Sequence, residues 1–164
     1  MTVAIRPFRP DEAALYREIR LEGLRMHPEA FGSAFEQEEA RPLDFFRERL
    51  ETNVIFAGFL GEEPLGTAGF TVQAGVKRAH KGMLWGMYVR PAARGTGLAR
   101  LLVETVLAHA RERVELIELS VVAENRVAYR LYASLGFEPY GLERRALKID
   151  GRYWDEALMV KMPP

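Results

Sequence analysis

The chain of 164 residues contains no cysteine. Disulfide bonds, thiolate metal sites and a cysteine nucleophile are therefore excluded. Lysine and arginine number 23 and aspartate and glutamate also number 23, so the formal net charge is zero. Nothing indicates a nucleic-acid partner, because such a partner calls for a basic surface.

Long apolar runs are also missing from this sequence. No stretch approaches the roughly 20 apolar residues that cross a bilayer. Charged side chains, among them Arg6, Arg9 and Arg17, interrupt the beginning of the chain where a signal peptide would be apolar. We therefore expect a cytoplasmic protein that does not associate with a membrane.

What the sequence does contain is typical of one folded domain. Hydrophobic residues make up 48% of the chain and charged residues 28%, as in ordinary globular proteins. The length suits a single hydrophobic core, and no repeat or low-complexity tract divides it. We expect one domain over residues 1–164.

Apolar periodicity and turn residues predict an α+β order of elements. We expect strands at 3–8, 53–60, 65–72, 83–89, 115–122, 144–149 and 153–162. We expect helices at 10–27, from 42, from 97 and at 125–135, with an irregular acidic segment at 28–41. Gly86 inside a strand indicates a bulge, and Asp150-Gly151 indicates a tight hairpin turn.

The segment from Tyr88 to Arg100 (YVRPAARGTGLAR) has the pattern of an anion-binding turn. A strand ends, a short loop follows, and Gly95 and Gly97 open a helix. Unpaired N–H groups and the positive end of the dipole lie at a helix N-terminus, so this is a cradle for phosphate. Leu98-Ala99 rules out a Walker loop and Arg100 a dinucleotide fingerprint. A plain connection without a ligand is the alternative.

Two motifs resemble the GNAT family of N-acetyltransferases. Arg94-x-x-Gly97-x-Ala99 resembles the family signature Q/R-x-x-G-x-G/A, and the segment Asn125 to Phe137 resembles N-x-x-A-x-x-L-Y-x-x-x-G-F. The resemblance covers about residues 83–137. It implies the GNAT acyl-CoA N-acyltransferase fold, a mixed central sheet of about seven strands flanked by about four helices. It also implies acetyl-CoA as co-substrate and no metal.

The resemblance assigns roles to individual residues. The strand that enters the cradle pairs through its backbone with the pantetheine arm, which here implies Met87, Tyr88 and Val89. Asn125 caps the following helix and contacts the cofactor. The pyrophosphate is held by Arg94, Gly95, Thr96, Gly97, Leu98, Ala99 and Arg100.

Tyr132 is the residue that the resemblance implies as general acid, donating a proton to the departing thiolate. Packing in an apolar helix stripe is its alternative role. Several relatives carry a basic Glu where this chain has Ser120, which is no efficient base. Glu118 is a weak candidate, His80 another, and a water chain a third.

The sequence does not identify the amine that accepts the acetyl group. The acidic residues Glu36, Glu38 and Glu39 either attract a cationic amine or form a solvated loop. Aromatic residues either line an acceptor pocket or pack in the core, namely Phe31, Phe35, Phe45, Phe46, Tyr153 and Trp154.

The function that we expect is direct transfer of acetyl to a small-molecule amine in a ternary complex. Transfer to a protein N-terminus or lysine is the alternative acceptor. A non-catalytic acyl-CoA-binding regulatory protein is an alternative of another class, and a homodimer is possible.

Overall fold

In the computed structural model, which describes residues 2–164, seven strands form one mixed sheet in the order β1-β2-β3-β4-β5-β7-β6. The strands are β1 (Ala4–Pro7), β2 (Val54–Leu60), β3 (Glu63–Val72), β4 (Lys81–Val89), β5 (Leu116–Val122), β6 (Glu138–Ile149) and β7 (Arg152–Lys161). The helices are α1 (Ala13–Met26), α2 (Phe35–Glu39), α3 (Leu43–Thr52), α4 (Leu98–Ala110) and α5 (Arg126–Ser134). Short 3-10 helices follow the prolines, at η1 (Pro10–Glu12), η2 (Pro28–Ala30) and η3 (Pro91–Ala93).

The predicted α+β fold is confirmed, with one addition. The expected strands are all present, and α4 forms the crossover between the parallel strands β4 and β5. The acidic segment 28–41 was expected to be irregular, but it contains η2 and α2. Helix α2 raises the number of α-helices within residues 2–164 to five.

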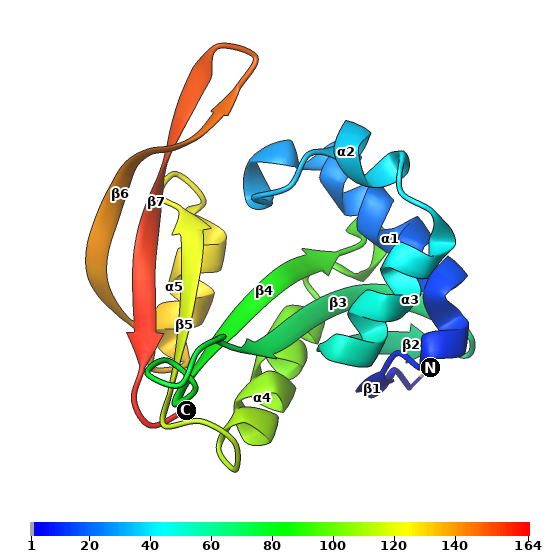
Figure 1. Ribbon diagram of the computed structural model, residues 1–164, viewed down its shortest axis with the longest axis horizontal. Helices are drawn as coiled ribbons and strands as arrows, with labels where there is room; N and C mark the ends of the chain where they lie inside the picture. The colour runs from blue at the N-terminus through cyan, green and yellow to red at the C-terminus, as the bar shows by residue number, and fades with distance from the viewer. Residues whose placement is uncertain (1) are drawn as a thin grey trace.

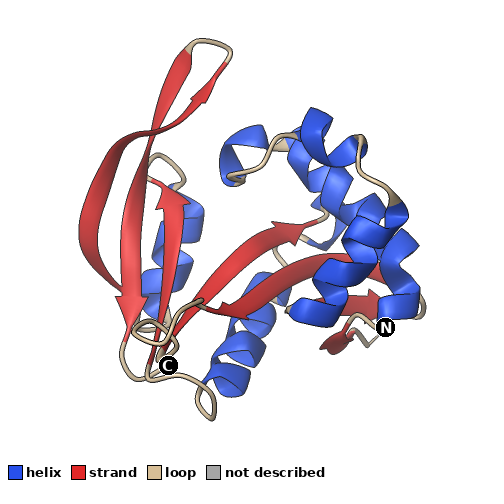
Figure 2. Ribbon diagram, in the orientation of Figure 1, coloured by secondary structure: helices blue, strands red, loops and turns tan. Residues whose placement is uncertain are grey.

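Helices cover both faces of the sheet, as Figures 1 and 2 show. On one face α4 and α5 pack against a core that includes Leu102, Val106 and Tyr132. On the other face α1 and α3 pack against a second core that includes Ile19 and Phe46. Strand β4 contributes Leu84 to the first core and Tyr88 to the second, so it lies between the two helical layers.

Strands β4 and β5 pair only at one end. Their parallel register joins Lys81, Gly82 and Met83 to residues 116–118 and then stops. Beyond this point the two strands diverge, and the gap between them is visible in Figure 1. Backbone N–H and C=O groups on the facing edges therefore lack strand partners, although these groups normally require hydrogen bonds.

The bulge predicted at Gly86 is present in β4. Gly86 has φ +65°, a conformation that glycine adopts without steric cost. The pairing of β3 with β4 shifts between Thr67 and Gly69 at the same place, and the Thr67 hydroxyl donates a 2.9 Å hydrogen bond to the Gly86 carbonyl. The bulge turns the end of β4 away from β5.

Strands β6 and β7 form a long hairpin that projects beyond the rest of the sheet (Figure 1). Its turn residues Asp150 and Gly151 have φ values of 49° and 80°, which suit the tight turn predicted from the Asp-Gly pair. The hairpin tip faces the segment of η2 and α2, so it closes one side of a cleft described below.

Within residues 2–164, no helix has the length and apolar character needed to span a bilayer.

Candidate functional site

A groove of about 350 Å³ runs from the start of α4 to the middle of α5. The end of β4 forms its floor through Met87, Tyr88 and Val89. Arg94 lines one end of the groove and Tyr132 the other. Six of the eleven residues predicted to bind the cofactor line this groove, namely Met87, Tyr88, Val89, Arg94, Ala99 and Asn125. The other five, Gly95, Thr96, Gly97, Leu98 and Arg100, lie outside its lining.

The N-terminus of α4 presents a row of free backbone donors. The N–H groups from Gly95 to Arg100 have no protein acceptor among the hydrogen bonds of residues 2–164. Gly95 and Gly97 have φ values of +76° and +87°. A Cβ at either position would meet no protein atom within 4 Å, so the donors are open to a ligand. The backbone of residues 95–100 therefore has the geometry expected of the predicted phosphate cradle.

Two arginines flank the cradle. The Arg94 Nη2 lies 2.9 Å from His27 Nε2, and its Nε donates a 3.1 Å hydrogen bond to the Val89 carbonyl. Arg100 donates a 2.7 Å hydrogen bond to the Ser134 hydroxyl. These contacts hold both guanidinium groups near the helix N-terminus, where their charge adds to that of the dipole.

Tyr88 contributes to the groove through its backbone, because its side chain points into the opposite layer. The ring is buried, and the hydroxyl donates a 2.7 Å hydrogen bond to Glu22. Burial first, and then the Glu22 carboxylate, raise the pKa of Tyr88 to about 12. The side chain thus anchors the strand end to α1 as a neutral group.

A smaller cavity of about 110 Å³ continues from the groove into the gap between β4 and β5. Gly86, Met87, Asn125 and Tyr132 line it. Asn125 caps α5, since its Oδ1 accepts a 3.2 Å hydrogen bond from the Ala128 N–H. Residues of both predicted motifs therefore meet at this inner cavity.

Tyr132 lies at the junction of the groove and the inner cavity. Burial raises the pKa of its hydroxyl, so the group stays protonated through the neutral range. No hydrogen bond to this hydroxyl is present within residues 2–164. The ring also packs edge-on against Phe137 at 5.8 Å, so the packing role and a chemical role are compatible.

Of the carboxylates considered as base, Glu118 does not reach the inner cavity. Its carboxylate lies 3.7 Å from Lys81 and accepts a 2.9 Å hydrogen bond from Gln73. Ser120 does line the cavity. Two carboxylates that the sequence did not indicate also line the inner cavity, Glu29 on η2 and Glu156 on β7. Strand register decides which face Glu156 occupies, and register is not evident from sequence alone.

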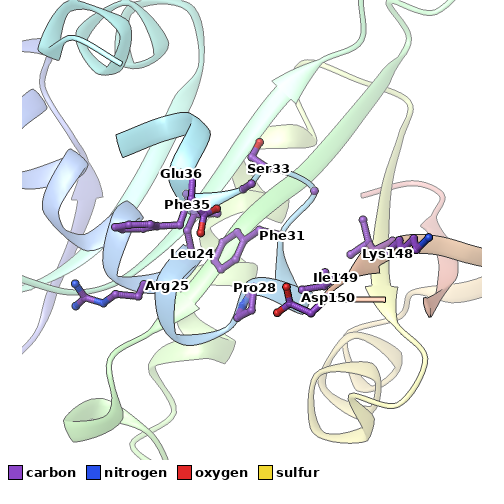
Figure 3. A pocket seen from close by; sticks show the side chains of 13 residues that line it. Leu24, Arg25, Pro28, Phe31, Ser33, Phe35, Glu36, Lys148, Ile149 and Asp150 are labelled. Atoms are coloured by element: carbon purple, nitrogen blue, oxygen red, sulfur yellow. The ribbon is translucent and has the colours of Figure 1, made fainter. Parts of the chain in front are cut away.

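An outer cleft of about 420 Å³ lies between the loop after α1 and the tip of the β6–β7 hairpin. Figure 3 shows Phe31 and Phe35 from the loop side and Lys148 and Asp150 from the hairpin side. Glu36 also lines it. Of the predicted acceptor aromatics, Phe31 and Phe35 are therefore at the cleft, whereas Phe46 is fully buried in the core.

Glu38 was expected in a solvated loop or near a cationic amine, but it is buried in an ion-pair network. Its carboxylate lies 2.9 Å from Arg20 and 3.0 Å from Arg49. Burial alone would raise its pKa, but the hydrogen bonds and charges of the two arginines outweigh this and lower the pKa of Glu38 to about 2. The network fastens α2 to α1 and α3.

Comparison with known proteins gives matches along most of the chain. A model described as the Acetyltransferase (GNAT) family matches residues 15–137. Mycothiol acetyltransferase from Kineococcus radiotolerans is 34% identical over 142 residues, covering 82% of this chain and 42% of that protein. N-alpha-acetyltransferase RimI from Mycobacterium tuberculosis is 40% identical over 63 residues, covering 38% of this chain and 39% of that protein.

The matches therefore span less than half the length of these two curated relatives. Among solved structures, yncA from Salmonella typhimurium, determined with its cofactor acetyl-CoA, superposes with a TM-score of 0.82 at 20% identity. The superposition covers 100% of this chain and 95% of that chain. At this identity the likeness shows that the two proteins share the fold.

Proposed function

Because the chain belongs to the GNAT acetyltransferase family, we propose that it transfers acetyl from acetyl-CoA to a primary amine. Acetyl-CoA is the co-substrate of this family, so the prediction of the co-substrate is confirmed. The amine attacks the thioester directly within a ternary complex, because the chain has no cysteine to carry an acetyl group.

One observation supports the proposal: a single groove is lined by Arg94 and Ala99 beside the open N–H groups of residues 95–100, by the unpaired edge of β4, and by Tyr132. The cradle of Arg94 to Arg100 is suited to the pyrophosphate. The free backbone of Met87 to Val89 is suited to the amide groups of the pantetheine arm, since both sides need hydrogen bonds. Asn125 borders the same path.

Tyr132 serves as the general acid in this proposal. Its buried hydroxyl is protonated at neutral pH and has no protein partner within residues 2–164, so it is free to donate to the thiolate. A backbone N–H of the β4 bulge near Gly86 polarises the thioester carbonyl, as donors in an oxyanion hole do. The thioester supplies the activated acetyl group, and the chain supplies positioning and proton transfer.

The acceptor enters from the outer cleft, and we propose a small-molecule amine. A volume of about 420 Å³ lies in the range of roughly 300–1,000 Å³ that holds small ligands. The hairpin tip closes one side of the cleft, which favours a compact acceptor over a long peptide. A curated relative is named for a small-molecule acceptor, mycothiol.

A protein N-terminus is the second candidate acceptor, favoured by the match to the relative named N-alpha-acetyltransferase. Two measurements test the proposals. Calorimetry with acetyl-CoA tests the cradle, and binding weaker than the micromolar range argues against it. Acetylation of a panel of small amines, amino acids and peptides then separates the acceptors. Binding without any transfer identifies the non-catalytic class.

A further inference from the structure

A carboxylate faces the inner cavity from β7, the strand next to β5 in the sheet. Glu156 lines this cavity together with Ser120 and Tyr132. Its side chain is half-buried, and no hydrogen bond or ion pair to it is present in the described part of the chain, residues 2–164. A half-buried charge without a partner is costly, so its position calls for an explanation.

Strand β6, the neighbour of β7, adds a second unfavourable interaction at Glu156, a like-charge repulsion. Glu143 on β6 lies directly opposite Glu156 in the antiparallel register. Like charges in this arrangement destabilise a sheet. Burial first, and then the Glu143 charge, raise the pKa of Glu156. Unfavourable placement of a titratable group beside a cavity is typical of functional sites.

Glu156 shares a sheet face with Ser120, the position where several relatives carry a basic Glu. In the register of β5 with β7, Ser120 is opposite Leu158 and Val122 is opposite Glu156. Opposed residues share a face, and residues two apart along a strand share it too. Ser120 and Glu156 are therefore on the same face, although they come from different strands. Glu156 lies two residues along β7 from Leu158, the partner of Ser120.

We propose that the Glu156 carboxylate takes the proton from the acceptor ammonium. This inference rests on the proposed function. A primary ammonium carries three protons. Glu156 takes the first, and the free amine forms the C–N bond while the C–S bond breaks. Tyr132 protonates the thiolate and regains a proton from the new nitrogen. The amide keeps the third proton, and Glu156 releases its own to solvent.

The other titratable groups that face the cavity fit this role less well. Glu29 lies at the mouth where the groove and cavity join, and its carboxylate is 3.7 Å from His27. Tyr132 is held protonated by burial. Glu143 is exposed and does not line the cavity. Glu156 thus combines access to the cavity with freedom from a cationic partner.

The variant Glu156→Gln tests the proposal, with the best acceptor from the amine panel. At pH 7 we expect kcat/KM to fall about 100-fold or more, with unchanged calorimetric affinity for acetyl-CoA. Activity should recover as the pH approaches the ordinary amine pKa of about 10.4, because the acceptor then loses its proton to solvent. A purely structural role would not produce this recovery.

Two further variants complete the design. Glu143→Gln keeps Glu156 and removes the charge opposite it, so the acidic limb of the pH profile should move to lower pH. Glu29→Gln should cost less activity than Glu156→Gln at pH 7. Thermal unfolding checks the fold of each protein; Glu156→Gln should be no less stable than wild type, since it removes a repulsion.

Three outcomes overturn the inference but leave the proposed function standing. They are full activity of Glu156→Gln at pH 7, loss of acetyl-CoA binding by Glu156→Gln, and a larger loss of activity in Glu29→Gln than in Glu156→Gln. A wild-type chain that acetylates no amine overturns the proposed function and this inference with it.

Discussion

The buried network of Arg20, Glu38 and Arg49 allows a quantitative prediction for Glu38→Gln. The carboxylate is only 5% exposed and contacts both arginines. Its pKa falls from 4.5 to about 2 on folding, which corresponds to about 3 kcal/mol of folding free energy. Independently of the pKa, removing one partner of a buried ion pair typically costs about 3–5 kcal/mol of folding free energy. We therefore expect a loss of about 3 kcal/mol at pH 7.

The sign of the pH dependence follows from the depressed pKa of Glu38. Its contribution is fully present above pH 4.5, the unfolded value, and is lost as the pH falls toward 2, the folded value. The wild type should therefore lose its advantage over Glu38→Gln in acid. At pH 3 the difference should be less than half of that at pH 7.

Urea unfolding at the two pH values measures both quantities. With a slope of about 2 kcal/mol per M, a loss of 3 kcal/mol lowers the midpoint by about 1.5 M. Glu39→Gln is the matched control, because Glu39 is the exposed neighbour on the same helix, and it should change stability by less than about 0.5 kcal/mol. Equal differences at pH 7 and pH 3, or a loss below about 1 kcal/mol, would refute the reasoning.

Three other substitutions test the site. Gly97→Val forces a branched side chain into φ +87° over the open donors, and calorimetry should show acetyl-CoA affinity reduced at least about 10-fold; unchanged affinity removes the cradle assignment. Tyr132→Phe should lower kcat about 100-fold with acetyl-CoA affinity kept, and full turnover in steady-state assays would leave Tyr132 with packing alone. Asn125→Ala removes the cap on the Ala128 N–H and should cost about 1 kcal/mol in thermal unfolding; a change near zero means that water replaces the cap.

The sequence predicted those features that depend on neighbouring residues. Gly86 marked the bulge, Asp150-Gly151 marked the hairpin turn, and Gly97 marked the start of a helix, because each conformation needs a particular residue type. The two motifs predicted the family, and with it the co-substrate.

Features that depend on distant contacts were not evident from the sequence. Glu38 lies in an acidic run that resembles a solvated loop, and its burial follows from Arg20 and Arg49 on two other helices. Glu156 lies in a strand whose inward face is set by pairing with β5. No local signal distinguishes such carboxylates from surface ones, so the sequence indicated Glu118 instead.

The short contact between β4 and β5 has a consequence for the mechanics of the fold. Within residues 2–164, the strand pairing of β4 with β5 is confined to residues 81–83 and 116–118, next to a hydrogen bond from the Glu115 N–H to the His80 carbonyl. Among the described residues, no backbone pairing joins the two strands beyond this seam. A molecule lying in the gap acts as a wedge that fixes the spread of both edges. Binding should therefore slow amide hydrogen exchange at the end of β4 and in β5 together. In the proposed function, the acyl donor therefore acts as a structural brace as well as a reactant.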